Sequence, residues 1–172
     1  MFLKGDDIQL RALEPNDLDL LYTWENNSEI WNVSQTLVPF SKFVLRQYLE
    51  NQHLDIYTTK QLRLVIVNSN NIPVGLIDLF DFDPQNSRAG IGILISDEKD
   101  RGKGYSKSAL KILLDYAFNH LDLHQVYANV GVDNIPSIGL FTGLNFKEIG
   151  VKKDWIKNGV SFQDEILFQC IR

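Results

Sequence analysis

A short loop in the middle of the chain has the residue types needed to bind an anion. It reads Arg101-Gly102-Lys103-Gly104 and lies between an apolar run typical of a strand and a helical pattern. Backbone N–H groups at a helix start lack intrahelical partners and carry a partial positive charge. The glycines permit close approach and positive φ angles, and the two side chains add cations. The loop indicates a phosphate or pyrophosphate site; a tight turn whose glycines serve geometry alone is the alternative.

Three carboxylates are the second group that could do chemistry. Asp78, Asp81 and Asp83 lie in or just after an otherwise apolar strand. A buried carboxylate is costly unless it is paired, and a well-placed carboxylate can take or relay a proton. A strand with one solvated face is the alternative explanation for Asp78. Turn preference favours a structural role for Asp83, which precedes Pro84.

Other reactive residue types show no arrangement that predicts chemistry. The histidines His53, His120 and His124 show no metal-ligand spacing with Cys170, so no metal site is expected. A nucleophile-elbow context is missing around the serines Ser96, Ser106 and Ser137.

The composition predicts one soluble domain that spans residues 1–172. Hydrophobic residues make up 44% of the chain and charged residues 23%, which is ordinary for a globular protein. The net charge of −5 argues against a general nucleic-acid binder and permits a cationic substrate.

The compartment is predicted to be the cytoplasm. Cys170 is the only cysteine, which excludes an intrachain disulfide and fits a reducing environment. Residues 1–8 do not form a signal peptide. No stretch approaches the roughly 18 apolar residues that a membrane span requires, so no membrane partner is expected.

The N-terminal third predicts a strand followed by helices. Apolar and polar residues alternate over 8–13. A helix start is signalled at 15–17, and the helix frays at 26–28. Residues 28–40 have weak periodicity and predict a loop or a short helical turn. Ser41 can cap a second helix.

The rest of the chain predicts a series of strands interrupted by helices. An Asn-Gly pair near residue 158 is a strong hairpin signal. The predicted elements are strands 62–67, 74–82 and 89–96, a helix ending near Leu121, strand 126–132, a short helix through Phe141, a strand that opens at 146–149, and strand 162–171.

This order predicts an α/β or α+β fold with a mixed sheet. A Rossmann fold requires more regular alternation of strands and helices, and the loop lacks the G-x-G-x-x-G spacing. A Walker A sequence is also missing.

Two motifs together resemble those of the GNAT-superfamily N-acetyltransferases, and the resemblance covers nearly the full length. Residues 101–106 (R-G-K-G-Y-S) match [Q/R]-x-x-G-x-[G/A], with Ser106 in place of the usual small residue. Residues 134–141 (N-I-P-S-I-G-L-F), followed by Leu144-Asn145-Phe146, match the second signature. The branches that look most similar are the spermidine or diamine acetyltransferases and the ribosomal-protein N-terminal acetyltransferases.

The resemblance implies a mostly antiparallel central sheet with a splayed central strand pair, flanked by helices, and acetyl-CoA as the donor. Strand 93–95 would splay from strand 126–132 and pair with pantetheine. A backbone N–H near Leu94 or Ile95 would polarise the thioester carbonyl. The implied CoA-binding residues are Ile93, Leu94, Ile95, Arg101, Gly102, Lys103, Gly104, Tyr105, Ser106, Asn134, Ser137 and Phe141. A helix N-cap is an alternative role for Asn134, compatible with the first.

The resemblance also implies an amine acceptor that attacks the thioester directly. An alkylamine is mostly protonated near neutral pH, because its pKa is about 10, so a carboxylate or a water chain must take the proton. Asp78 and Asp81 match positions that are acidic in the polyamine branch, and one of them is expected to orient the ammonium or relay its proton. Trp31 is the best candidate for the wall of the acceptor pocket.

Three departures from the family pattern leave the acceptor open between a polyamine, another small amine and a protein N-terminus. Phe141 stands where a Tyr commonly protonates the CoA thiolate, unless the register is shifted by one. Gly90 stands where related enzymes often carry a Glu, and residues 34–37 lack an acidic pair. A non-catalytic acyl-CoA sensor or a nucleotide-binding protein are the competing hypotheses. A homo-oligomer, dimer or higher, is a reasonable expectation for a soluble enzyme.

Overall fold

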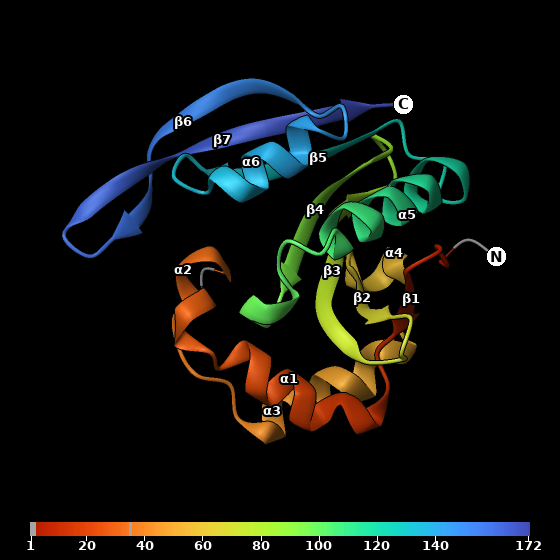
Figure 1. Cartoon of the computed structure of the whole chain (residues 1–172). Helices are drawn as coiled ribbons and strands as arrows, with labels where there is room; N and C mark the ends of the chain where they lie inside the picture. The colour runs from red at the N-terminus through yellow and green to blue at the C-terminus, as the bar shows by residue number, and fades with distance from the viewer. Residues whose placement is uncertain (1–2, 35) are drawn as a thin grey trace.

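The computed structural model describes residues 3–34 and 36–172. Met1 and Phe2 of segment 1–8 and Gln35 of segment 34–37 lie outside the described residues. Within them, seven strands form one sheet in the order β1-β2-β3-β4-β5-β7-β6 (Figure 1). Neighbouring strands are antiparallel except β4 and β5, which are parallel. The strands are β1 (Ile8–Ala12), β2 (Leu62–Asn68), β3 (Pro73–Asp83), β4 (Arg88–Ile95), β5 (Gln125–Gly131), β6 (Lys147–Asn158) and β7 (Ser161–Ile171).

Helices cover both faces of the sheet. Figure 1 shows α5 and α6 on one side, and α1 and α3 on the other. The α-helices are α1 (Leu18–Glu25), α2 (Trp31–Ser34), α3 (Lys42–Glu50), α4 (Ile56–Thr59), α5 (Tyr105–Asn119) and α6 (Ile135–Thr142). Short 3-10 turns are η1 (Pro15–Asp17), η2 (Ser28–Ile30), η3 (Asn51–His53) and η4 (Glu98–Asp100).

Strand alternation divides the core into two apolar clusters. In β2, Leu64 and Ile66 belong to the large cluster under α5 and α6, whereas Val65 and Val67 join a smaller cluster with α1 and α3. Because successive side chains point to opposite faces, β2 is buried on both sides. Most residues of β6 are exposed at both alternating positions, so this edge strand is little covered on either face.

The parallel pair β4 and β5 separates along its length. Its register covers only Arg88 to Gly90 against Gln125 to Tyr127, although β4 continues to Ile95 and β5 to Gly131. The backbone edge of β4 beyond Gly90 is therefore open on the β5 side. The predicted mixed, mostly antiparallel sheet with a splayed central pair is confirmed.

Most predicted elements are confirmed, and their bounds differ where the signal was weak. Segment 28–40 contains the short helical turns η2 and α2. Strand β6 begins within the predicted opening 146–149 and continues to Asn158, at the Asn-Gly turn. The hairpin forms with Gly159 at φ 61°, and helix α4 was not predicted.

Candidate active site

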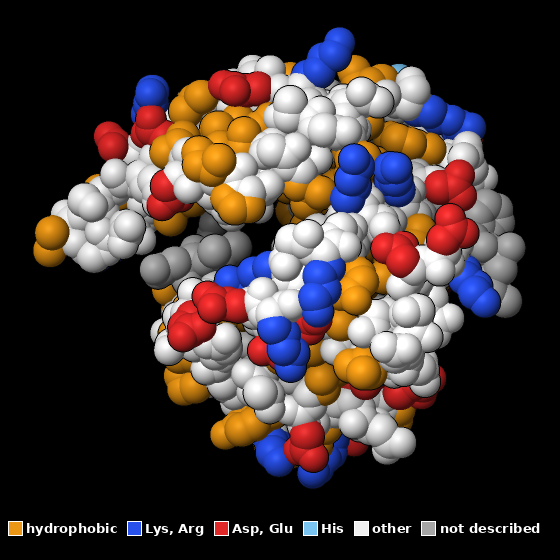
Figure 2. Space-filling model, viewed as in Figure 1, with side chains coloured by type: hydrophobic (Ala, Val, Ile, Leu, Met, Phe, Trp, Pro, Cys, Tyr) orange, Lys and Arg blue, Asp and Glu red, His pale blue; other side chains and the backbone are white. Residues whose placement is uncertain are grey.

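An open cleft of about 600 Å³ passes through the sheet where β4 and β5 diverge. Its walls come from α6 on one face and from α1, β2 and β3 on the other. In Figure 2 the molecule is hollowed between the arm that carries the β6–β7 hairpin and the lobe that carries α1 and α2. A molecule bound in this cleft can therefore be approached by a second molecule from the opposite face.

The glycine loop forms a turn at the start of α5. Gly102 and Gly104 have φ angles of 76° and 87°, in the region that favours glycine. A Cβ on either residue would meet no atom within 4 Å, so the backbone conformation requires glycine here and the available space does not. Gly104 is the N-cap of α5, and its position supplies no side-chain cap. The first N–H groups of α5 are thus left for a solvent molecule or an anion.

The two cations of the loop contact groups within the same segment. Lys103 Nζ lies 2.8 Å from Asp100 Oδ1, and this hydrogen bond raises the pKa of Lys103 above its ordinary value. Arg101 Nε donates to the Ile95 carbonyl oxygen over 3.4 Å, and its guanidinium lies 3.9 Å from Glu98. These contacts fasten the turn to the end of β4, so attraction for an anion comes first from the backbone N–H groups.

The second motif caps α6 and also lines the cleft. The Asn134 side-chain oxygen accepts a hydrogen bond of 3.2 Å from the Ser137 backbone N–H, which confirms its role as an N-cap. Asn134, Ser137 and Phe141 all line the cleft. Phe141 is 4% exposed, and its ring packs against Phe146 and Phe168 with centroid distances of 5.0 and 6.2 Å. No hydroxyl is present at this position.

A close approach between β3 and β4 orients one peptide at the cleft. An added Cβ on Gly75 would lie 2.1 Å from the Leu94 carbonyl oxygen and 3.1 Å from Ile95 Cα. Only a glycine at position 75 leaves room for the Leu94 carbonyl oxygen to approach β3 this closely. The C=O and N–H of a planar trans peptide point in opposite directions, so the Ile95 N–H points away from β3, toward the side where β5 diverges.

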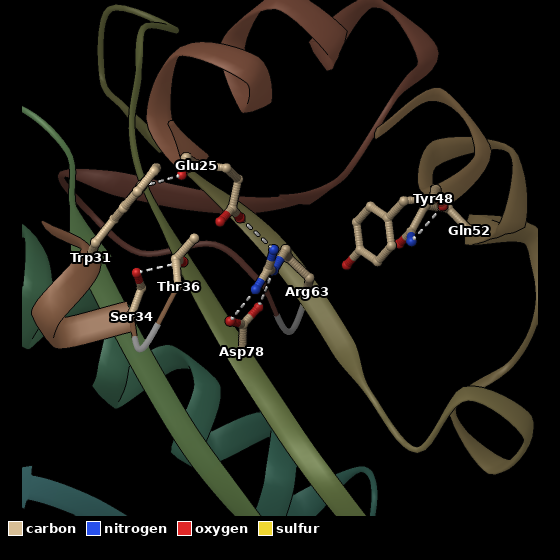
Figure 3. A network of polar contacts seen from close by, with 8 residues as sticks. All are labelled: Glu25, Trp31, Ser34, Thr36, Tyr48, Gln52, Arg63 and Asp78. Carbon is tan, nitrogen blue, oxygen red and sulfur yellow. Dashed lines mark hydrogen bonds and ion pairs between the residues drawn. The ribbon is translucent and has the colours of Figure 1, made fainter. Parts of the chain in front are cut away.

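Arg63 on β2 joins two carboxylates on the opposite wall of the cleft (Figure 3). Its Nε and Nη2 donate to the two oxygens of Asp78 over 2.7 and 3.0 Å. Its Nη1 donates to Glu25 Oε1 over 2.7 Å, and the Tyr48 ring lies 5.7 Å away. Burial alone would lower the pKa of Arg63, but the charge and hydrogen bonds of Asp78 raise it above its ordinary value. Asp78 therefore lies in the cleft as the partner of a permanent cation.

The ring of Phe80 fills the space beside Gly90. A Cβ on Gly90 would lie 2.3 Å from a Phe80 ring carbon. Phe80 also meets Tyr127 edge to face at 5.9 Å, and it lines the cleft. A larger residue at position 90 would have to displace the Phe80 ring, and this aromatic surface stands where the family often has a Glu.

The other acidic candidates lie outside the cleft. Asp81 occupies a bulge with φ 49°, lines a neighbouring shallow hollow and accepts a hydrogen bond of 3.2 Å from the Tyr127 hydroxyl. Burial and the nearby Asp81 raise the pKa of Tyr127. Asp83 accepts hydrogen bonds of 3.0 and 2.7 Å from Asn86, which confirms its turn role. The structure thus brings Asp78 to the cleft and leaves Asp81 beside it.

The third wall comes from the last hairpin. Lys152 donates to Asn129 over 3.0 Å and forms an ion pair with the buried Glu165. Its ammonium also lies 4.7 Å from the centroid of the Trp155 ring. Trp155 is thus a wall residue, as its residue type suggested, whereas Lys152 and Glu165 were missed in the sequence because no motif spacing connects them.

Glu25 and Arg63 were also missed, although an arginine inside an apolar strand was a usable signal. The cleft-lining residues near Trp31 are Ile30 and Ser34, whereas the Trp31 indole donates to the Glu25 carbonyl over 2.9 Å. Trp31 thereby steadies the end of α1, where Glu25 lies.

Within the described part of the chain, no helix is long and apolar enough to cross a membrane. Among the same residues, no group of three or more His, Cys, Asp or Glu side chains is placed to hold a metal ion.

The sheet opens at a parallel strand pair, and a glycine turn without a side-chain cap starts the helix that follows β4, which is the arrangement that the family resemblance implies. A family model described as "Acetyltransferase (GNAT) domain" matches residues 7–147. The chain therefore belongs to the GNAT acetyltransferase family. The predicted resemblance to this family is confirmed.

The most similar proteins include named N-acetyltransferases. Spermidine N(1)-acetyltransferase of Vibrio cholerae serotype O1 is 30% identical over 93% of this chain and 90% of its own. An N-acetyltransferase 9-like protein of Nematostella vectensis is 38% identical over 86% of this chain and 78% of its own. A crystal structure of the Vibrio cholerae spermidine enzyme in complex with CoA and spermine has a TM-score of 0.85 at 27% identity, covering 95% of each chain.

Proposed function

We propose that the protein transfers the acetyl group of acetyl-CoA to a primary amine by direct attack of the amine on the thioester. The observation that carries this proposal is the cleft through the sheet, which is lined by the open edge of β4 and, on the opposite wall, by the carboxylates of Glu25 and Asp78. The Vibrio cholerae relative that binds CoA and spermine supports it.

The donor end of the cleft fits CoA in two respects. The φ angles of Gly102 and Gly104 turn the loop so that N–H groups of residues 102–106 can face a pyrophosphate. The open edge of β4, with Ile93 and Leu94 in the cleft, offers unpaired backbone groups to pantetheine. Acetyl-CoA would supply the activated acetyl group.

The Ile95 N–H is our candidate for the donor that polarises the thioester carbonyl. Gly75 holds its peptide in place, and such preorganised donors act without reorganisation cost. Asn134, Ser137 and Phe141 would line the pantetheine arm from α6.

The acceptor ammonium would enter on the face that carries Glu25 and Asp78. Both carboxylates line the cleft, and their charges favour a cation. We assign Asp78 the role of orienting the ammonium together with Glu25. Asp81, in the neighbouring hollow with Tyr127, is the candidate for carrying the proton away through water. Since Phe141 has no proton to give, water would protonate the leaving thiolate.

A thiol-release assay tests this function. The protein is incubated with acetyl-CoA and, separately, primary amines, polyamines and peptides with free N-termini, and free CoA thiol is measured. Thiol release above the amine-free rate, together with mass-spectrometric detection of the acetylated amine, is expected. CoA binding without acetylated product on any amine would reject the transferase.

The second candidate is a non-catalytic acyl-CoA sensor. It is favoured by one observation, that Phe141 and the Phe80-covered Gly90 leave two family positions without a proton-transferring group. Binding of acetyl-CoA by calorimetry with no turnover in the same assay would support it.

A further inference from the structure

The charged residues that line the cleft nearly cancel. Four carboxylates, on Glu25, Asp78, Asp133 and Glu165, face three cations, on Arg63, Lys152 and Lys157. A polyamine carries several positive charges, and each of them needs a partner once it leaves water. The cleft therefore has a surplus of about one negative charge, which matches one ammonium.

Most of the acidic groups already have partners. Both oxygens of Asp78 accept hydrogen bonds from Arg63, and Glu165 is paired with Lys152. Glu25 gives only its Oε1 to Arg63, so its other oxygen is the acceptor best placed to meet an incoming ammonium. Arg63 thus reduces the attraction of this wall for a second positive charge.

Apolar and aromatic surface fills much of the remaining wall. Phe80 covers Gly90, and Leu76 lies beside Asp78 on the same strand face. Ile30 of η2 and Trp155 of β6, which is 60% exposed, also line the cleft. The Lys152 ammonium, already paired with Glu165, lies over this indole, so that ring face is taken and a cation of the substrate would find the Glu165 carboxylate beside it already paired. Such walls suit an uncharged body.

We propose that the acceptor is a monocationic amine, whose one positive charge is the ammonium that reacts and whose body is uncharged. This inference rests on the proposed acetyl transfer and names its substrate class. A free small amine and the N-terminus of a peptide share this chemistry. A polyamine does not, because its further charges would approach Lys152 and Lys157.

The experiment compares kcat/KM for four acceptors at one acetyl-CoA concentration and about 0.15 M salt. They are spermidine, hexylamine, phenethylamine and a tetrapeptide with a free N-terminus and uncharged side chains. We expect the best monocation to exceed spermidine at least tenfold. If hexylamine or phenethylamine is the best acceptor, the substrate is a free small amine. If the tetrapeptide is the best acceptor, the substrate is a peptide N-terminus. Equal or better use of spermidine would overturn the proposal while leaving acetyl transfer intact, whereas no product from any amine would reject both.

A charge reversal gives a second, independent readout. Lys157 is exposed and lines the cleft, so Lys157→Glu adds negative charge there without disturbing the core. The ratio of kcat/KM for spermidine to that for the best monocation should rise at least threefold. Lys147→Glu, an exposed position on the same strand outside the cleft, should leave the ratio unchanged. A ratio that is the same in both variants would contradict the charge argument.

Discussion

The two ends of the cleft are built from different parts of the polypeptide. The donor end consists of main chain, namely the turn at Gly102 and Gly104, the start of α5 and the open edge of β4. The acceptor end consists of side chains, with Arg63 between Glu25 and Asp78. Main-chain groups are the same whatever the residue, so the first surface can stay constant within a family while the second changes. In the proposed function, the donor site is thus set by main-chain geometry, and the acceptor site is set by the side chains of this chain.

This contrast predicts that substitutions at the two ends of the cleft change different properties of the protein. A side chain added at the donor end changes backbone conformation and hence binding or rate. A side chain removed at the acceptor end leaves charges without partners and hence changes stability.

The largest effect is expected for Arg63→Met. The substitution leaves Glu25 and Asp78, whose side chains are 15% and 17% exposed, without their shared cation. Breaking a buried ion pair by removing one partner costs about 3 kcal/mol or more, so the free energy of unfolding in urea should fall by about that amount.

Arg46→Met is the matched control, because Arg46 is exposed on α3. Its unfolding free energy should stay within about 0.5 kcal/mol of the parent. A loss below about 1 kcal/mol for Arg63→Met would mean that water already compensates the two carboxylates.

Gly75→Ala should reduce kcat about tenfold or more, since removing a donor of the oxyanion type costs at least that much. The methyl group would lie 2.1 Å from the Leu94 carbonyl oxygen and must rotate the peptide that carries the Ile95 N–H. Because the glycine turn is not touched, the Kd for CoA should change by less than about threefold.

Gly150→Ala provides the comparison for Gly75. Gly150 lies in β6, and an added Cβ meets nothing within 4 Å, so kcat should be retained. If Gly75→Ala lowers both CoA affinity and kcat, Gly75 maintains the position of the whole of β4 and not only the orientation of the Leu94–Ile95 peptide.

Gly104→Ala should weaken CoA binding about tenfold, measured by calorimetry. An alanine at φ 87° is strained by roughly 1–2 kcal/mol, and relief of that strain would turn the first N–H groups of α5 away. Gly139→Ala in α6, where a Cβ meets nothing within 4 Å, should bind CoA as the parent does. Unchanged affinity of Gly104→Ala would argue that the turn only connects β4 to α5.

The donor end was predictable from the sequence because its determinants are local. Residues 101–106 and 134–141 are each one contiguous segment on one turn or helix, and the second segment lines the cleft with Asn134, Ser137 and Phe141. The strand order before the glycine loop was also readable, since β2, β3 and β4 follow one another as antiparallel neighbours.

The acceptor end was not predictable because its residues meet only in the folded chain. Glu25 and Arg63 are 38 positions apart, and no motif joins them. Asp78 and Asp81 were treated as equivalent, but the bulge between Phe80 and Asp83 turns Asp81 into a different hollow. The reason for Gly75 is likewise a contact between two strands, which residue type alone does not reveal.

The smallest effect is expected at η1, the turn that leads into α1. Asp17 accepts hydrogen bonds of 2.7 and 2.8 Å from Arg11 and one of 2.8 Å from the Glu14 N–H. These hydrogen bonds, Arg11 first, lower the pKa of Asp17 below its ordinary value. The folded state therefore favours the charged carboxylate. Its stabilisation is present at neutral pH and is lost as the pH falls through the lowered pKa.

Asp17→Asn should reduce the free energy of unfolding at pH 7 by about 1 kcal/mol and make it fall less steeply below about pH 4. Asp19→Asn is the control, because Asp19 pairs with Lys42 in an exposed position where ion pairs contribute little. Neither variant should change CoA affinity, since α1 lies on the acceptor side of the sheet. An equal acid response of Asp17→Asn and the parent would show that other carboxylates control the stability of the protein at low pH.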